Sequence, residues 1–141
     1  MMTERIEEFR IGRDPMAVRD MRHAVRRMCC SADLPADTCD TAMLLTSETV
    51  TNAIVHAGTS ARLVIRASSG CIRVEVTDDN NRSPTTAPTR TDATHGRGIG
   101  LIDTLATRWG IQRHTHGKTV WFEIVPESSI APHHLVLPPT G

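Results

Sequence analysis

The sequence predicts one domain of the α/β (α+β) class, in which helices cover the apolar face of an antiparallel hairpin. The chain has 141 residues, enough for one domain to bury a sizeable core without disulfides or metals. Apolar residues recur at helical spacing over residues 16–31, whereas they alternate with polar residues over 61–67 and 72–77. An alternating strand has one face for a core and one for solvent. We therefore expect these two strands to pack on helices through their apolar faces.

The composition argues against several classes of function. The 16 basic and 16 acidic residues cancel, so no overall field favours nucleic acid or an anionic membrane as a partner. Aromatic residues make up only 3% of the chain, too few for the stacking platforms of a single-strand binder. No apolar run reaches membrane length and the charged start is unlike a signal peptide, so we expect a cytoplasmic protein. The cysteines form no CxxC pair and are expected to be reduced thiols, not metal ligands: Cys29, Cys30, Cys39 and Cys71.

The first predicted elements are a short strand and a basic amphipathic helix. Apolar residues within 6–11 favour a strand. Asp14 and Pro15 then mark a helix start, with Asp14 as the N-cap and Pro15 at the first helical position, where its missing N–H costs nothing. The helix is expected to end near residue 31, and arginines lie between its apolar positions. This basic face is either simply solvated or a contact surface for a partner.

A central helix carries a row of polar residues. We expect it to run from Asp37, whose carboxylate caps the free N–H groups, to Gly58, which suits the left-handed C-terminal conformation. Glu48, Asn52 and His56 recur every four residues and so lie about one turn apart on one side. Apolar neighbours place this side at least partly in the core, where polar groups need partners. Either these groups satisfy one another or a nearby loop, or their partner is a metal-phosphate, since Mg²⁺ accepts carboxylate and carboxamide oxygens.

A long segment without periodicity leads to a glycine-rich helix start. Residues 79–97 are rich in Pro, Thr, Asp and Arg, and a loop of this length in a compact domain is either disordered or functional. Gly96, Gly98 and Gly100 then open a helix. Glycines let the backbone approach a phosphate, which the free N–H groups at a helix start stabilise. The stretch is neither a Walker loop nor a dinucleotide-binding fingerprint, because it lacks GK[ST] and the third glycine.

The remaining sequence predicts two strands and a tail. The strands are expected over residues 111–115 and 119–125. The proline-rich residues 126–141 are expected to form an extended or disordered end. We therefore expect a folded domain over residues 1–125, followed by this tail.

The order of these parts resembles that of the GHKL ATPases. ETVTNAIVHA is similar to the N box of that superfamily, the strand ending in Asp78 to its first glycine box, GRGIGL to its second, and GKTVWFEI to its terminal Gly-Thr segment. The helix before the N box and the GKTVWFEI ending are most similar to the bacterial anti-sigma-factor serine kinases. The resemblance covers about residues 14–125. It implies a two-layer sandwich of the Bergerat type, a mixed, mostly antiparallel sheet with helices on one face and ATP between the central helix and the loop.

The resemblance also implies a role for each matching residue. Asn52 would coordinate the Mg²⁺ that bridges the ATP phosphates, Asp78 would accept the exocyclic amino group of adenine, and Thr119 would support adenine through its hydroxyl. Glu48 would be the catalytic base that takes the proton of an attacking serine or water. The phosphates would be wrapped by Gly96, Arg97, Gly98, Ile99 and Gly100.

Two functions of different classes follow from the resemblance. The first is an ATP-dependent serine/threonine kinase that phosphorylates a small anti-sigma factor antagonist and also sequesters a sigma factor, working as a homodimer. The second is a nucleotide-binding switch that regulates a protein partner without transferring phosphate. Its motivation is the stretch after Asp78, which lacks the glycines of the first glycine box. A structural domain without a ligand is a third reading, but it leaves the polar row of the central helix unexplained.

Overall fold

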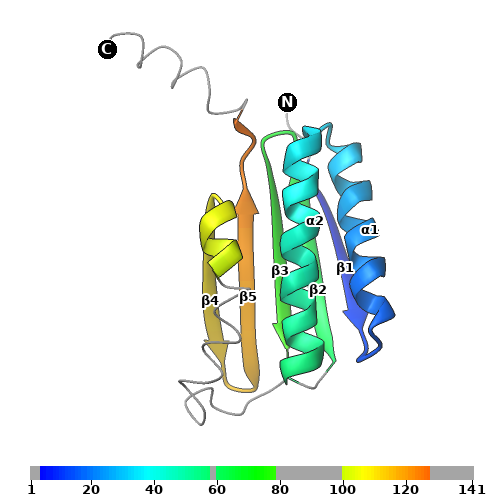
Figure 1. The fold of residues 1–141 in the computed structure, drawn as a ribbon, viewed down its shortest axis with the longest axis vertical. Coiled ribbons are helices and arrows are strands. Elements are labelled where there is room, and N and C mark those ends of the chain that lie inside the picture. Colours follow the sequence, from blue (N-terminus) through cyan, green and yellow to red (C-terminus); the bar gives the residue numbers. More distant parts are fainter. Residues whose placement is uncertain (1–3, 58–59, 79–99, 128–141) are drawn as a thin grey trace, which may run out of the picture.

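The fold is a two-layer sandwich of one sheet and the helices on one of its faces (Figure 1). A computed structural model describes residues 4–57, 60–78 and 100–127. The predicted α+β class and two-layer arrangement are confirmed. None of the helices in the described ranges is long and apolar enough to span a membrane. The strands are β1 (Arg5–Ile11), β2 (Ala61–Ser68), β3 (Cys71–Asp78), β4 (Arg108–His114) and β5 (Gly117–Ile124).

The five strands are ordered β1-β2-β3-β5-β4 across the sheet. All four pairings between them are antiparallel, so the parallel component of the predicted mixed sheet does not occur among these strands. The central strand β3 therefore lies between its hairpin partner β2 and the much later β5. This pairing brings the end of β3 next to the beginning of β5.

The first helix, α1 (Met16–Ser31), begins at the predicted cap. Pro15 already has helical dihedral angles, with φ −56° and ψ −24°. The Asp14 carboxylate accepts a hydrogen bond from the Met16 N–H at 2.9 Å, which satisfies one of the free donors of the first turn. The prediction that Asp14 caps this helix and Pro15 opens it is confirmed.

The turn after α1 is a Schellman-type helix end. Asp33 adopts a positive φ of 58°, a left-handed conformation that aspartate tolerates better than most residues. The Leu34 N–H then reaches back to the Cys29 carbonyl at 3.0 Å, and the Leu34 side chain is buried. The chain is thereby redirected into the second helix without leaving these backbone groups unsatisfied.

The central helix is α-helical only in its first part. This part, α2 (Ala36–Thr51), begins one residue before Asp37, whose carboxylate accepts the Thr38 N–H at 2.8 Å. The chain continues as a π-helix, η1 (Asn52–Ala57). The prediction of one α-helix from Asp37 to Gly58 is therefore wrong over Asn52–Ala57, and Gly58, its predicted end, lies outside the described residues. Because a π-helix bonds residue i to i+5, a four-residue spacing no longer equals one turn there.

Hydroxyl side chains give a physical reason for this transition. Ser47 Oγ donates to the Met43 carbonyl at 3.0 Å, and Thr49 Oγ1 donates to the Leu45 carbonyl at 2.6 Å. Both carbonyls also belong to the backbone ladder of α2, and such back-bonding weakens and bends helices. The competition occurs in the turns directly before η1.

The core lies between the helices and the helix-covered face of the sheet. In β2 and β3 the buried side chains alternate with more exposed ones, as the sequence predicts. Both long helices and the later part of the chain contribute to the same cluster. Its fully buried members include Val25, Leu45, Val50, Leu63, Ile65, Ile72, Val74, Ile102 and Phe122.

The region after the glycine-rich segment differs in detail from the prediction. Residues 100–105 are helical, as expected after the glycines. Ile102 is buried in the core, whereas Leu105 is 39% exposed. β4 begins at Arg108 and β5 at Gly117, both earlier than predicted. The early start of β4 follows from Trp109, which packs against the core.

The opposite face of the sheet carries a charged network. Arg73 bonds the carboxylates of Glu75 at 2.7 Å and Glu123 at 2.8 Å, and its guanidinium lies 4.1 Å from the ring centroid of Trp121. Arg108 adds a second ion pair to Glu123 at 2.9 Å. Burial acts to lower the pKa of Arg73, but the two carboxylates outweigh it and raise that pKa above its usual value. The alternating polar positions of β3 and β5 are therefore paired with each other across the strands.

Candidate functional site

Several predicted site residues lie at one end of the domain. α2 and η1 end there, beside the end of β3 and the beginning of β5 (Figure 1). η1 lies against β3. Glu48 and Asn52 come to this end from the central helix, and Asp78 comes to it as the last residue of β3. The fold thus places Asp78 at the same end of the domain as Glu48 and Asn52, which come from a separate element much earlier in the sequence.

Asp78 is a buried carboxylate on the helix-covered face of the sheet. It is 4% exposed. Along β3 every second residue points to the same face, so Asp78 shares the face of the buried Val74 and Val76. Its cross-strand partner is Lys118, whose Nζ lies 3.3 Å from Asp78 Oδ2. Because a buried carboxylate is costly without compensating charge or hydrogen bonds, this ammonium helps to make its burial tolerable.

Thr119 lies on the other face. It pairs with Thr77 across β3 and β5, and the two hydroxyl oxygens are 2.6 Å apart. His114 Nε2 also lies 2.7 Å from Thr119 Oγ1. This register puts the Thr119 hydroxyl on the face opposite Asp78, because successive residues along a strand point to opposite faces. The support of adenine by Thr119 stays a prediction, and Lys118 is the residue directly across from Asp78.

Glu48 and Asn52 flank the change from α-helix to π-helix. The Asn52 N–H bonds the carbonyls of Glu48 and Thr49, so the two side chains still lie about one turn apart. Both are partly buried, and neither has a side-chain hydrogen bond or ion pair to the described parts of the chain. Short π-helical segments occur frequently at functional sites. The side chain of His56, the third member of the polar row, lies outside the described residues.

The proposed phosphate-wrapping segment lies almost wholly outside the described residues. This applies to Gly96, Arg97, Gly98 and Ile99. Gly100 is described and is exposed at the start of the helical residues 100–105. A β-carbon built at Gly100 would meet nothing within 4 Å among the described residues. Its carbonyl accepts a hydrogen bond from Thr104 Oγ1 at 2.8 Å.

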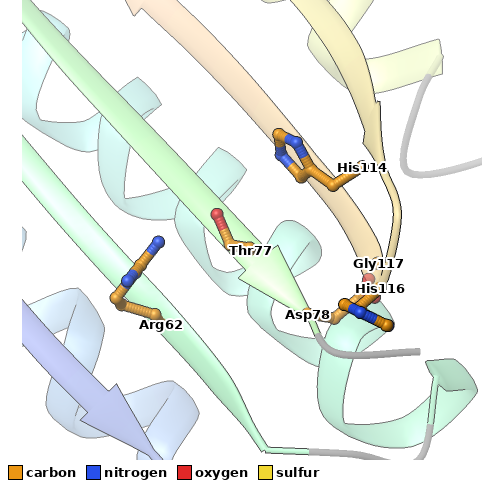
Figure 2. Close-up of a pocket in the computed structure, with 6 residues that line it drawn as sticks. All are labelled: Arg62, Thr77, Asp78, His114, His116 and Gly117. Atoms are coloured by element: carbon orange, nitrogen blue, oxygen red, sulfur yellow. The ribbon is translucent and has the colours of Figure 1, made fainter. Parts of the chain in front are cut away.

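A small pocket opens at the same end of the sheet, on the helix-free side (Figure 2). Its volume is about 220 Å³, below the roughly 300–1,000 Å³ of typical ligand sites. The side chains that line the pocket are mostly basic or carry a hydroxyl group. One of them, Arg62, is paired with Glu8, whose Oε2 lies 3.5 Å from the Arg62 Nε. Glu48 and Asn52 do not line it, so this pocket alone does not accommodate the predicted site. It is lined by Arg62, Thr77, Asp78, His114, His116 and Gly117.

Lys118 is the residue beside Asp78 that the sequence reasoning did not single out. The sequence did contain information about its orientation. Val120, Phe122 and Ile124 occupy alternate positions along β5, and Lys118 occupies the alternate position before Val120. Phe122 and Ile124 are buried under the helices. The alternation therefore assigns Lys118, and not Thr119, to the face of Asp78.

The comparisons with known proteins agree with this geometry. The family described as the histidine kinase-like ATPase domain matches residues 11–124. An uncharacterized protein of Streptomyces coelicolor, SCO4941, is 34% identical over 79 residues, covering 52% of this chain and 75% of that protein.

Two solved structures share the fold. A chain of the SiaB-SiaC complex from Pseudomonas aeruginosa superposes with a TM-score of 0.61 at 13% identity, over 84% of this chain and 88% of that chain. The histidine kinase domain of the blue-light activated histidine kinase from Erythrobacter litoralis gives a TM-score of 0.54 at 20% identity, over 83% and 63% of the respective chains. At these identities the two likenesses concern the fold. The family match over residues 11–124 shows that this chain belongs to the histidine kinase-like ATPase domain family.

Proposed function

We propose that this protein binds ATP with Mg²⁺ at the end of β3 and acts as an anti-sigma-factor-type serine/threonine kinase. The observation that carries the proposal is the buried carboxylate of Asp78, on the helix-covered face and at the same end of the domain as Glu48 and Asn52. A buried carboxylate at a ligand site can accept a hydrogen bond from an amino group that enters from solvent. Membership of the ATPase domain family supplies the ligand class.

Each residue has a role in the proposed reaction. Asp78 accepts the exocyclic amino group of adenine, and the backbone of residues 96–100 binds the phosphates. Asn52 supplies a carboxamide oxygen for Mg²⁺, which neutralises phosphate charge when bound. Glu48 takes the proton from the serine hydroxyl of the acceptor protein as the serine oxygen bonds to the γ-phosphorus and the bond to ADP breaks. The proposal is supported by the position of Glu48, which lies about one helical turn from Asn52.

The proposed partners are proteins. We assign the phosphoryl acceptor to the class of anti-sigma factor antagonists and the sequestered protein to the sigma factors, with the kinase acting as a cytoplasmic homodimer. Support comes from the Pseudomonas aeruginosa structure, which is a complex of two proteins. α1 offers a candidate contact surface, since Arg19 and Arg26 are exposed on it and Arg27 pairs only loosely with Glu7, at 3.5 Å.

A second candidate is a switch that binds nucleotide without transferring phosphate. It is favoured by the stretch after Asp78, Asp79-Asn80-Asn81-Arg82, where the resembling superfamily has glycines. Glycine permits backbone conformations that a side chain disfavours, so the substituted stretch is expected to alter closure over the nucleotide. In this case partner binding would depend on ATP but not on Glu48.

Phosphoryl transfer to a protein separates the two candidates. The protein is incubated with γ-labelled ATP and with each small antagonist-type protein of the same genome. We expect labelled serine in one of them with the wild type and with Asp40→Asn, a control that removes an exposed carboxylate from the same helix. Glu48→Gln should abolish the label without unfolding the domain. If ATP binds but no acceptor is labelled, the kinase assignment is wrong and the switch remains.

A further inference from the structure

We propose that Lys118 and Asp78 together recognise the edge of the adenine base, with Lys118 donating a hydrogen bond to the ring nitrogen N1. This inference rests on the proposed ATP binding and deepens it, because it assigns a specificity-determining residue that the sequence motifs do not indicate. It starts from the register of β3 and β5, which pairs Asp78 with Lys118.

The pair presents an acceptor and a donor side by side. Asp78 Oδ2 and Lys118 Nζ are 3.3 Å apart and lie on the same face of the sheet. The Watson–Crick edge of adenine carries the complementary arrangement, since its amino group donates and the adjacent N1 accepts. An ammonium group has three N–H donors and no acceptor, so bonding Asp78 leaves others for the base.

Burial suits the two residues to different parts of this task. The Asp78 side chain is 5% exposed and the Lys118 side chain 26%, so the carboxylate is the more deeply buried of the two and the lysine side chain is the more accessible. Hydrogen bonds from a charged donor are stronger than those between neutral groups. A site built around such a donor discriminates against an analogue that lacks the matching acceptor, because the donor then makes no hydrogen bond to the base.

The residues next to Lys118 on β5 cannot provide a donor beside Asp78. Thr119, which follows Lys118, has its hydroxyl on the opposite face beside Thr77. Gly117, which precedes Lys118, has no side chain. On β4, Arg113 pairs with Lys118 but is exposed. Arg113 therefore serves as a control for the loss of a positive charge next to the site.

The test compares ATP with 1-deaza-ATP, in which a C–H replaces N1, by calorimetric titration in the presence of Mg²⁺. We expect the wild type to bind 1-deaza-ATP about tenfold more weakly than ATP, the order expected for a hydrogen bond to a charged group. Lys118→Met should bind the two nucleotides equally and at the weaker affinity. Lys118→Arg, which keeps a donor, and Arg113→Met should both retain the preference for ATP.

The outcomes separate this inference from the proposed function. If the wild type binds ATP and 1-deaza-ATP equally, or if Lys118→Met keeps the tenfold preference, the base-reading role of Lys118 is wrong while ATP binding stands. If the wild type binds neither nucleotide, both the proposed function and this role fail. Circular dichroism and thermal unfolding of Lys118→Met establish that any loss of preference occurs in a folded protein.

Discussion

Gly110 and Trp121 are cross-strand partners in β4 and β5, and the indole covers the glycine so closely that a side chain has no room there. A β-carbon at position 110 would lie 2.8 Å from the indole Nε1 and 2.9 Å from Cζ2. The other side of the indole is held by Arg73, whose guanidinium lies 4.1 Å from the ring centroid. The helix-free face of the sheet is thus closely packed around one tryptophan.

Gly110→Ala should therefore destabilise the domain. The added methyl group overlaps the indole, which Arg73 confines on its other side, and overpacking of this kind costs about 1–3 kcal/mol. Urea unfolding followed by tryptophan fluorescence measures the change in the free energy of unfolding. Gly12→Ala is the matched control, since a β-carbon at Gly12 meets nothing within 4 Å among the described residues. Equal effects of the two substitutions would contradict the observed packing of Trp121.

Arg73→Met should lower the free energy of unfolding by about 1–2 kcal/mol, because two carboxylates lose a close, charge-assisted partner. Arg62→Met provides the contrast. Its ion pair with Glu8 is longer, at 3.5 Å, and both side chains are about half exposed, so the expected loss is below about 0.5 kcal/mol. Urea unfolding of both variants at the same salt concentration checks the difference. A larger loss of unfolding free energy for Arg62→Met than for Arg73→Met would show that burial and distance do not determine the relative strengths of these ion pairs.

Thr46→Val should stabilise the protein by about 1 kcal/mol. The Thr46 hydroxyl is fully buried and has no hydrogen-bond partner within the described residues, and valine has nearly the same shape without the unsatisfied oxygen. Thr49→Val is the control, because the Thr49 hydroxyl bonds the Leu45 carbonyl at 2.6 Å and its removal brings no such gain. Thermal and urea unfolding should show that Thr46→Val is more stable than the wild type and that Thr49→Val is not. Indistinguishable variants would mean that the Thr46 hydroxyl is satisfied in solution.

Stability should fall as the pH rises above about 9. Burial raises the pKa of the Cys29 and Cys39 thiols above the unfolded value of 9.0, so at high pH the folded state binds more protons than the unfolded state. The free energy of unfolding then decreases by up to about 1.4 kcal/mol per pH unit for the fully buried Cys29 thiol, Cys39 adds to the decrease, and the effect is absent well below pH 9. Urea unfolding at pH 8 and pH 10 measures it. Cys29→Ala should reduce the slope, and an unchanged slope would contradict the assignment to this thiol.

Local rules were sufficient for the parts of the fold that depend on neighbouring residues. The Asp14 cap, the break after α1 and the hairpin of β2 and β3 follow from side-chain chemistry and alternation over a few positions. The π-helical continuation at Asn52 was not predictable in this way. It depends on where hydroxyl groups compete with the backbone and on how η1 packs against β3.

The candidate site shows the limit of motif matching. The motifs identify Glu48, Asn52 and Asp78, and the fold places all three at one end of the domain. The terminal Gly-Thr resemblance, however, pointed to Thr119, whereas cross-strand register decides which side chain faces Asp78. That register sets Lys118 opposite Asp78, and only the alternation along β5 carries this information in the sequence.

The most direct test of the proposed site is calorimetric titration with ATP, with and without Mg²⁺, on the wild type, Asn52→Ala and Asp78→Asn. We expect the wild type to bind ATP more tightly with Mg²⁺, Asn52→Ala to lose that advantage, and Asp78→Asn to lose measurable affinity. Asp40→Asn should behave as the wild type. Failure of the wild type to bind at millimolar ATP, or unchanged binding in Asp78→Asn, would contradict a nucleotide site at the end of β3.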